Sequence, residues 1–156
     1  MFPFIVVDTT NMIEPQSLED NIIYLVGEIA RLSHKRVTAI FTENQYDVTV
    51  EQFGVLALLW YQDGVNQQSI ALGLNRDKTT ITRIIYNMIK KNLIVKVPDQ
   101  LDKRNKLIYL TEKGRSLQKE MIESTSSVYI DALHKISETD IKTLTSVLQR
   151  MKRNLG

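Results

Sequence analysis

The order of predicted elements in the middle of this chain constrains its fold more than any other sequence feature. Apolar residues at helical spacing predict a short helix over residues 67–74. Asp77 is typical of an N-cap, and the pattern after it predicts a longer amphipathic helix that stops at Asn92. Two β-rich runs follow, residues 93–97 and 106–110, with a polar loop between them. These patterns predict a helix-turn-helix followed by a β-hairpin.

The helix that begins after Asp77 has one apolar face and one polar face. Its expected buried side chains are Ile81, Ile84, Ile85, Met88 and Ile89. A helix that enters the major groove of DNA needs a buried rear and a donor-rich front of this kind. Arginine can donate two hydrogen bonds to guanine, asparagine can pair with adenine, and threonine can reach a phosphate or a thymine methyl. The order of elements and this front together predict a winged helix-turn-helix that binds DNA.

Candidate DNA contacts lie on the polar front of this helix and at the tip of the hairpin. They are Lys78, Thr79, Thr80, Thr82, Arg83, Asn87, Lys103 and Arg104. An arginine on the hairpin tip suits the minor groove, where the potential is most negative. Residues 76–106 hold nine basic and three acidic side chains, a formal +6, whereas the rest of the chain carries −4. The alternatives are a solvated helix face and a hairpin tip that only aids solubility.

Long amphipathic helices are predicted on both sides of residues 49–111, the predicted DNA-binding lobe. They span residues 18–46 and 112–154, and they carry more apolar side chains than a small lobe can cover. We expect them to form a homodimer interface; the alternative is an intrachain helical bundle. Thr49 and Gln52 fit a capping box at the start of the lobe. The predicted architecture is one domain over residues 1–156, mainly α, with a small β-hairpin wing and a helical dimerisation region.

The motifs along these elements resemble the MarR family of bacterial and archaeal transcription regulators. They occur in the family's order at residues 49–56, 69–71, 77–83, 87–94, 102–104 and 110–115. The resemblance covers residue 18 to the C-terminus. It implies a homodimer whose first, fifth and sixth helices form the interface, with two winged lobes on a pseudo-palindromic operator. It also implies release or modulation by a small aromatic or anionic effector.

The resemblance also assigns roles to residues of the wing. Asp102 is expected to shape the hairpin, and Arg104 is expected to enter the minor groove. The family's usual glycines are replaced by Asn75 and Asn92, which can still adopt the left-handed conformation. Lys96 replaces the usual arginine, so the charge is kept and the planar fork is lost.

Catalysis and metal binding are disfavoured by the residues that the chain lacks or separates. Cysteine is absent, which excludes a thiol nucleophile, a thiolate zinc site and a thiol redox switch. His34 and His134 lie on different predicted helices, so we expect no metal site and no cofactor. The sequence contains no Gly-rich phosphate loop and no nucleophile elbow. We therefore expect a protein that is not an enzyme.

The remaining expectations concern location and partners. No apolar run approaches the roughly 20 residues that a membrane-spanning helix needs, so we expect no membrane partner and a cytoplasmic location. The segment before Ser17 lies outside the family pattern, and packing on a partner subunit is our interpretation of it. The predicted partners are double-stranded DNA, a second copy of the chain and an effector. A winged helix that binds protein instead of DNA is the alternative function.

Overall fold

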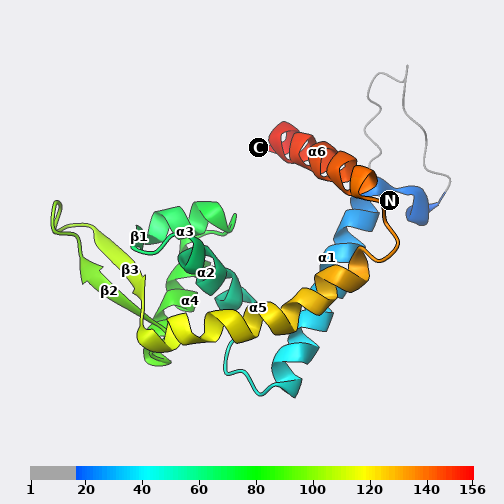
Figure 1. The fold of residues 1–156 in the computed structure, drawn as a ribbon. Coiled ribbons are helices and arrows are strands. Elements are labelled where there is room, and N and C mark those ends of the chain that lie inside the picture. The colour runs from blue at the N-terminus through cyan, green and yellow to red at the C-terminus, as the bar shows by residue number, and fades with distance from the viewer. Residues whose placement is uncertain (1–16) are drawn as a thin grey trace. The chain divides into compact units, whose positions relative to one another are not determined.

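The computed structural model describes residues 17–156, which form helices and a small antiparallel sheet (Figure 1). The elements are η1 Leu18–Asp20, α1 Ile22–Glu43, α2 Val50–Tyr61, β1 Val65–Asn66, α3 Gln67–Gly73, α4 Lys78–Lys90, β2 Ile94–Pro98, β3 Lys106–Leu110, α5 Glu112–Ala132 and α6 Glu138–Leu155. The predicted fold class, a mainly α winged helix-turn-helix, is confirmed. The interpretation of the segment before Ser17 falls outside the described residues.

Contacts divide the chain into two units, residues 1–35 and 36–156, and α1 continues from the first into the second. The prediction that residues 1–156 form one domain stays a prediction.

The first helix is shorter than the predicted span of residues 18–46. The chain makes a 3-10 turn, η1, before α1 begins. The Asn21 side chain accepts a hydrogen bond from the Tyr24 backbone N–H at 3.0 Å, which caps α1 at its first turn. At the other end, Gln45 has a φ of 57°, and this left-handed residue ends the helical path. Both ends are therefore decided by local hydrogen bonding and backbone conformation.

The predicted capping box at the start of α2 is confirmed. The Thr49 hydroxyl accepts the Gln52 N–H at 3.2 Å, and the Gln52 carboxamide oxygen accepts the Thr49 N–H at 3.1 Å. The helix then buries one face against α3, α4 and the sheet. The fully buried side chains of this core are Val55, Leu56, Leu59, Ile70, Ile81, Met88, Leu93, Ile94, Ile108 and Met121.

Both asparagines that replace family glycines adopt the predicted left-handed conformation. Asn75 has a φ of 49° in the turn between α3 and α4, and Asn92 has a φ of 55° between α4 and β2. Asparagine reaches this region at lower cost than most side chains other than glycine. The turn of the helix-turn-helix therefore forms without glycine.

The sheet has a strand that the sequence did not predict. The hairpin strands β2 and β3 pair antiparallel from Ile94–Leu110 to Pro98–Lys106. The two-residue strand β1 adds to the other edge of β3, with Val65 opposite Ile108, so the order is β1-β3-β2. Two residues are too few to show an alternating apolar pattern, so this strand depends on its distant partner. It joins the start of α3 to the base of the wing.

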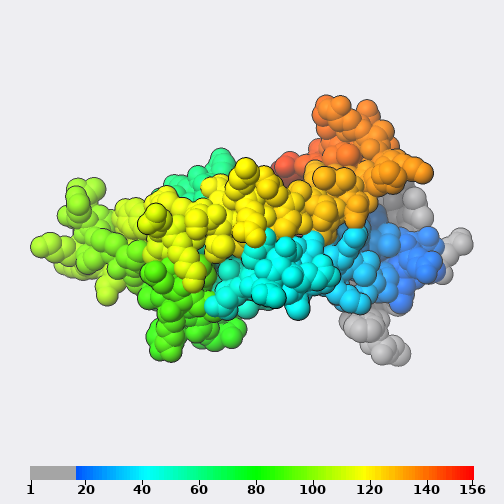
Figure 2. All heavy atoms as spheres, turned by 60° about the horizontal axis from the view of Figure 1, so that its bottom comes forward, coloured from blue at the N-terminus to red at the C-terminus, as the bar shows by residue number. Residues whose placement is uncertain are grey.

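The end of α1 lies beside α5 in the second unit (Figure 2). The Arg36 guanidinium forms an ion pair with the Asp131 carboxylate at 2.7 Å, and the Tyr46 hydroxyl donates to the Ser124 hydroxyl at 3.4 Å. The helix α5 is capped at its start, because the Thr111 hydroxyl accepts the N–H of residue 114 at 3.1 Å. The ion pair and the hydroxyl contact tie the end of α1 and the residues after it to α5.

One residue of the predicted buried face of α4 is exposed in the structure. Ile89 is 40% exposed. Consecutive helical residues point about 100° apart, so Ile89 lies beyond Ile85, at the edge of the buried stripe formed by Ile81, Ile84, Ile85 and Met88. No residue of α6 is buried within the structure.

Candidate nucleic-acid interface

The predicted DNA-contacting residues of α4 fall on two different faces of the helix. Lys78, Thr79, Thr82 and Arg83 are exposed, and with Tyr86 they line one open hollow on the outer face. Tyr86 is 57% exposed, and the Lys90 ammonium lies 4.5 Å from the centre of its ring. Because of its helical spacing and its exposure, Tyr86 belongs to the outer face and is a further candidate DNA contact. An aromatic three residues after Arg83 was the sequence signal for it.

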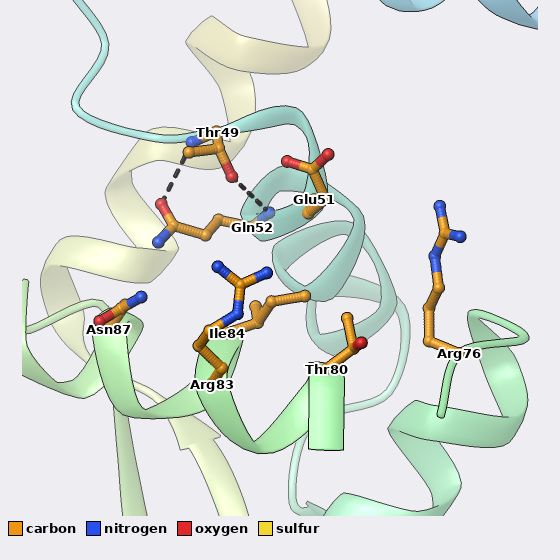
Figure 3. A pocket seen from close by; sticks show the side chains of 8 residues that line it. All are labelled: Thr49, Glu51, Gln52, Arg76, Thr80, Arg83, Ile84 and Asn87. Carbon is orange, nitrogen blue, oxygen red and sulfur yellow. Dashed lines mark hydrogen bonds between the residues drawn. The ribbon is translucent and has the colours of Figure 1, made fainter. Parts of the chain in front are cut away.

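Thr80 and Asn87 do not lie on this outer face. They are half-buried and turn toward the start of α2, where they line a pocket of about 330 Å³ (Figure 3). Its other lining residues are Thr49, Glu51, Gln52, Arg76, Arg83 and Ile84. Arg83 lines both surfaces, and in Figure 3 its guanidinium extends toward the start of α2. The polar residues that were expected to form one front on α4 therefore form two surfaces, an outer face and a pocket. Arg83 belongs to both.

The start of α4 is capped as predicted. The Asp77 carboxylate accepts the Thr80 backbone N–H at 2.8 Å and the Thr80 hydroxyl at 2.6 Å. These bonds stabilise the charged form of Asp77 and lower its pKa. The bond from the Thr80 hydroxyl has the larger effect, and the bond from the Thr80 N–H has the smaller one. The hydroxyl hydrogen of Thr80 is therefore used inside the protein. Only its acceptor lone pairs and its methyl group are left for a ligand.

Asp102 organises the tip of the wing through hydrogen bonds. One of its oxygens accepts the Arg104 backbone N–H at 3.0 Å, and the other accepts the Asn105 side-chain amide at 3.3 Å. The Leu101 N–H is bound in turn by the Asp99 carboxylate at 2.9 Å. Asp102 therefore holds the tip through the backbone of Arg104 and the side chain of Asn105.

Three cations, at the tip of the wing and at the start of α4, have no acidic partner in the described part of the chain. Within residues 17–156, no hydrogen bond or ion pair engages the side-chain nitrogens of Lys78, Lys103 or Arg104. These three cations are exposed. Unpaired cations are able to release the counterions of a polyanion, which is the main source of non-specific affinity for DNA.

The base of the wing is held by Asp63, which the sequence analysis did not single out. Its carboxylate accepts the Leu110 N–H at 2.9 Å and the Gly64 N–H at 3.1 Å, and it forms an ion pair with Arg115. Asp63 thus connects the end of α2 to β3 and α5. Its place directly before a glycine was the only local signal of a turn-forming role.

Two other kinds of feature are absent from the described part of the chain. Over residues 17–156, no group of three or more His, Asp or Glu side chains is placed to hold a metal ion. Within the same residues, no helix is both long and apolar enough to cross a membrane.

Comparison with protein-family models places residues 40–121 in the family described as transcriptional regulator SarA/Rot. The matched span contains the whole helix-turn-helix, the wing and the first part of α5. Among curated proteins, the chain is similar to the HTH-type transcriptional regulator MgrA of Staphylococcus aureus. The two are 27% identical over 107 residues, which is 69% of this chain and 71% of MgrA. The matched proteins are transcriptional regulators and not enzymes.

Two solved structures add information on ligands. A Listeria monocytogenes protein assigned to the MarR family, solved with a 26mer DNA, is 31% identical, with a TM-score of 0.79. The match covers 86% of this chain and 89% of that one. CouR from Rhodococcus jostii, bound to p-coumaroyl-CoA, is 26% identical with a TM-score of 0.78, and the match covers 87% and 94%.

Proposed function

Because this chain belongs to the SarA/Rot family of MarR-type winged-helix transcriptional regulators, we propose that it binds a pseudo-palindromic operator as a homodimer. DNA binding in transcription regulation is the activity of the family. Sequence preference, the dimer and control by a small ligand are parts of the proposal. In this proposal the protein acts as a repressor or an activator of transcription.

The observation that carries the proposal is the outer face of α4. Its exposed polar side chains, Thr79, Thr82 and Arg83, stand on a helix whose opposite face is buried, so the helix can enter a groove without unfolding the lobe. Lys103 and Arg104 are exposed and belong to the loop that joins β2 to β3 at the tip of the hairpin, which Figure 1 shows extending from the same lobe. Arg104 is the minor-groove residue of the proposal, and Asn87 and Thr80 contribute from the pocket side.

The exposed apolar side chains at the two ends of the chain support the dimer. In the first unit, seven large apolar residues from η1 and α1 are each at least 40% exposed: Leu18, Ile22, Ile23, Leu25, Val26, Ile29 and Leu32. In the second unit, α6 buries no residue although Ile141, Leu144, Val147 and Leu148 recur at helical spacing. A soluble monomer rarely leaves such surface uncovered, so a second copy is its natural cover.

Modulation by an effector is the weaker part of the proposal. CouR is a relative solved with an aromatic acyl-CoA, which supports an aromatic or anionic effector class for this chain. Release of DNA then requires that the effector bind the DNA-free conformation more tightly than the DNA-bound one. A screen of small aromatic acids for loss of DNA binding tests this part.

The decisive experiment selects binding sites for the purified full-length chain from random double-stranded DNA. We expect a two-fold symmetric site of roughly 16–20 base pairs, from half-sites about one helical turn apart with their flanks. The affinity for this site should exceed that for random DNA, and it should fall steeply with salt. Equal affinity for the selected site and for random DNA would remove sequence specificity from the proposal.

The dimer is tested separately by sedimentation as a function of protein concentration. We expect wild-type protein to be a dimer at micromolar concentration. Ile29 is exposed in the single chain and would be covered in the dimer, so Ile29→Asp would bury an unpaired charge and should shift the protein toward monomer. Leu72→Asp is the matched control, since Leu72 is an exposed apolar residue on α3 outside the proposed interface. A wild-type monomer at high concentration would contradict the dimer.

A further inference from the structure

A chain of hydrogen bonds connects the wing to α4 through the first residue of α3. The Lys96 ammonium on β2 donates to the Gln67 carboxamide oxygen at 3.1 Å. The Gln67 amide nitrogen donates to the Thr82 hydroxyl oxygen at 2.5 Å. The Thr82 hydroxyl donates in turn to the Lys78 carbonyl at 2.7 Å. Three elements of the lobe are thus joined next to the face proposed to contact DNA.

The direction of every bond in this chain follows from which groups can donate. An ammonium group can only donate, so Lys96 requires the oxygen of the Gln67 carboxamide on its side. The amide nitrogen of Gln67 therefore faces Thr82. Because Thr82 receives this hydrogen bond, its own hydrogen is directed to the Lys78 carbonyl. One arrangement of donors and acceptors satisfies all four groups.

We propose that Gln67 is a positioning residue that sets what Thr82 presents to a base pair. This inference rests on the proposed function, because it concerns how α4 reads DNA. With its hydrogen committed to Lys78 and one lone pair committed to Gln67, Thr82 offers a base only an acceptor and a methyl group. These groups suit a base amino group or a thymine methyl, and they do not suit the acceptor atoms of guanine.

Lys96 has a second consequence in the same arrangement. Its ammonium is held at Gln67 on the lobe, so it is not free to follow the DNA backbone as an unpaired lysine would. Lys96, which takes the place of the family's usual arginine, thus still donates to Gln67. Its compact ammonium group lacks the planar fork with which an arginine makes two parallel hydrogen bonds. Removal of the Gln67 carboxamide releases Lys96 and removes one of the two hydrogen bonds that hold the Thr82 hydroxyl.

The test compares base preference in Gln67→Ala with that in Gln68→Ala. Gln68 is the same residue type on the same helix, is exposed and takes no part in this chain of bonds. We expect Gln67→Ala to reduce discrimination about two- to tenfold at the base pairs facing Thr82, the size of one net hydrogen bond. Discrimination at other positions should stay the same. Gln68→Ala should leave the whole site unchanged.

A double-mutant cycle with Thr82→Val separates positioning from general stability. Valine keeps a methyl group and removes the hydroxyl, so Gln67→Ala should cause no further loss of preference in this background. An equal loss in both backgrounds, or a uniform loss across the whole site, would overturn the proposal. Thermal unfolding of each variant identifies any effect that comes from the stability of the lobe.

A measurement without DNA keeps this proposal distinct from the proposed function. In the free wild-type protein, three-bond NMR couplings should report one fixed χ1 rotamer for Thr82, and Gln67→Ala should make this rotamer average. A Thr82 side chain that is equally fixed in Gln67→Ala overturns the positioning role even if the wild type binds its operator. A wild type that does not discriminate DNA sequences overturns the proposed function while the χ1 result stands.

Discussion

Gly114 lies against the backbone carbonyl of Leu93, and a Cβ added to Gly114 would be 2.2 Å from that oxygen. The Leu93 carbonyl follows the turn after α4, and Gly114 is in the first turn of α5. The Trp60 indole donates to the Gly114 carbonyl at 2.9 Å, which brings α2 to the same point. Absence of a side chain at residue 114 therefore lets α5 approach the base of the wing.

We predict that Gly114→Ala destabilises the protein by about 1–3 kcal/mol, because the new methyl group must displace backbone. Gly54→Ala is the matched control, since its Cβ would meet only Leu74 side-chain atoms at 3.7 Å and 3.9 Å, which is ordinary contact. Gly54 is inside α2, so alanine there should be neutral or stabilising by about 0.5–1 kcal/mol. Chemical denaturation of both variants measures the difference. Equal stabilities would show that α5 can shift without cost.

The capping box gives a second prediction. Thr49→Ala should lower the free energy of unfolding by about 1 kcal/mol, because it leaves the Gln52 N–H without its partner. Thr49→Ser keeps the hydroxyl and should retain most of that stability. Urea denaturation of the three proteins compares them. A serine variant as unstable as the alanine variant would assign the effect to the threonine methyl group.

Arg83 and Arg104 should contribute differently to DNA binding. Arg83→Ala should relax base preference, with a loss of about 1–3 kcal/mol of discrimination at the bases it contacts. Arg104→Ala should weaken binding to all sites with less change in preference, because a wing arginine reads the potential of the minor groove. Competition binding with libraries of single-base variants of the operator measures both effects.

The salt dependence of DNA binding tests the role of Lys103 on the wing. If Lys103 contacts a phosphate, Lys103→Ala should reduce the slope of log affinity against log salt by about 1. A change in base preference for Lys103→Ala with an unchanged slope would contradict a phosphate contact.

The Asp77 cap should make stability depend on pH in acid. The pKa of Asp77 is lower in the folded protein than its usual value, mainly through the Thr80 hydroxyl, so folding favours the charged carboxylate. The resulting stabilisation is complete above the ordinary pKa, about 4, and is lost as the pH falls through the lower folded value. Asp77→Asn keeps a capping oxygen that does not titrate. Its melting temperature should therefore fall less than that of the wild type between pH 5 and 3; parallel curves would contradict this role of Asp77.

Features that depend on neighbouring residues in the chain were predictable. Thr49 and Asp77 were identified as caps, because a cap bonds a backbone N–H three residues ahead. The left-handed turns at Asn75 and Asn92 were predictable for a similar reason, since they depend on the conformational range of one residue. The wing strands were found within a residue of their observed ends.

Features that depend on distant contacts were not predictable from these patterns. The strand β1 exists because Val65 meets Ile108, which lies far along the chain. Ile89 has an apolar side chain, but it is exposed because α4 is turned so that Ile81 and Met88 face the core. The assignment of Asn87 to a pocket and of Thr82 to the outer face required the position of α2 beside α4.

The amino-acid sequence alone therefore determined the kind and order of the elements and the positive charge of residues 76–106, because caps, turns and helical periodicity act over a few residues. Only the tertiary structure decided that Gln67 bridges Lys96 and Thr82, and that Gly114 admits the Leu93 carbonyl. These relationships join residues from separate elements. Their geometry is set by how the whole lobe packs, and no local pattern records it.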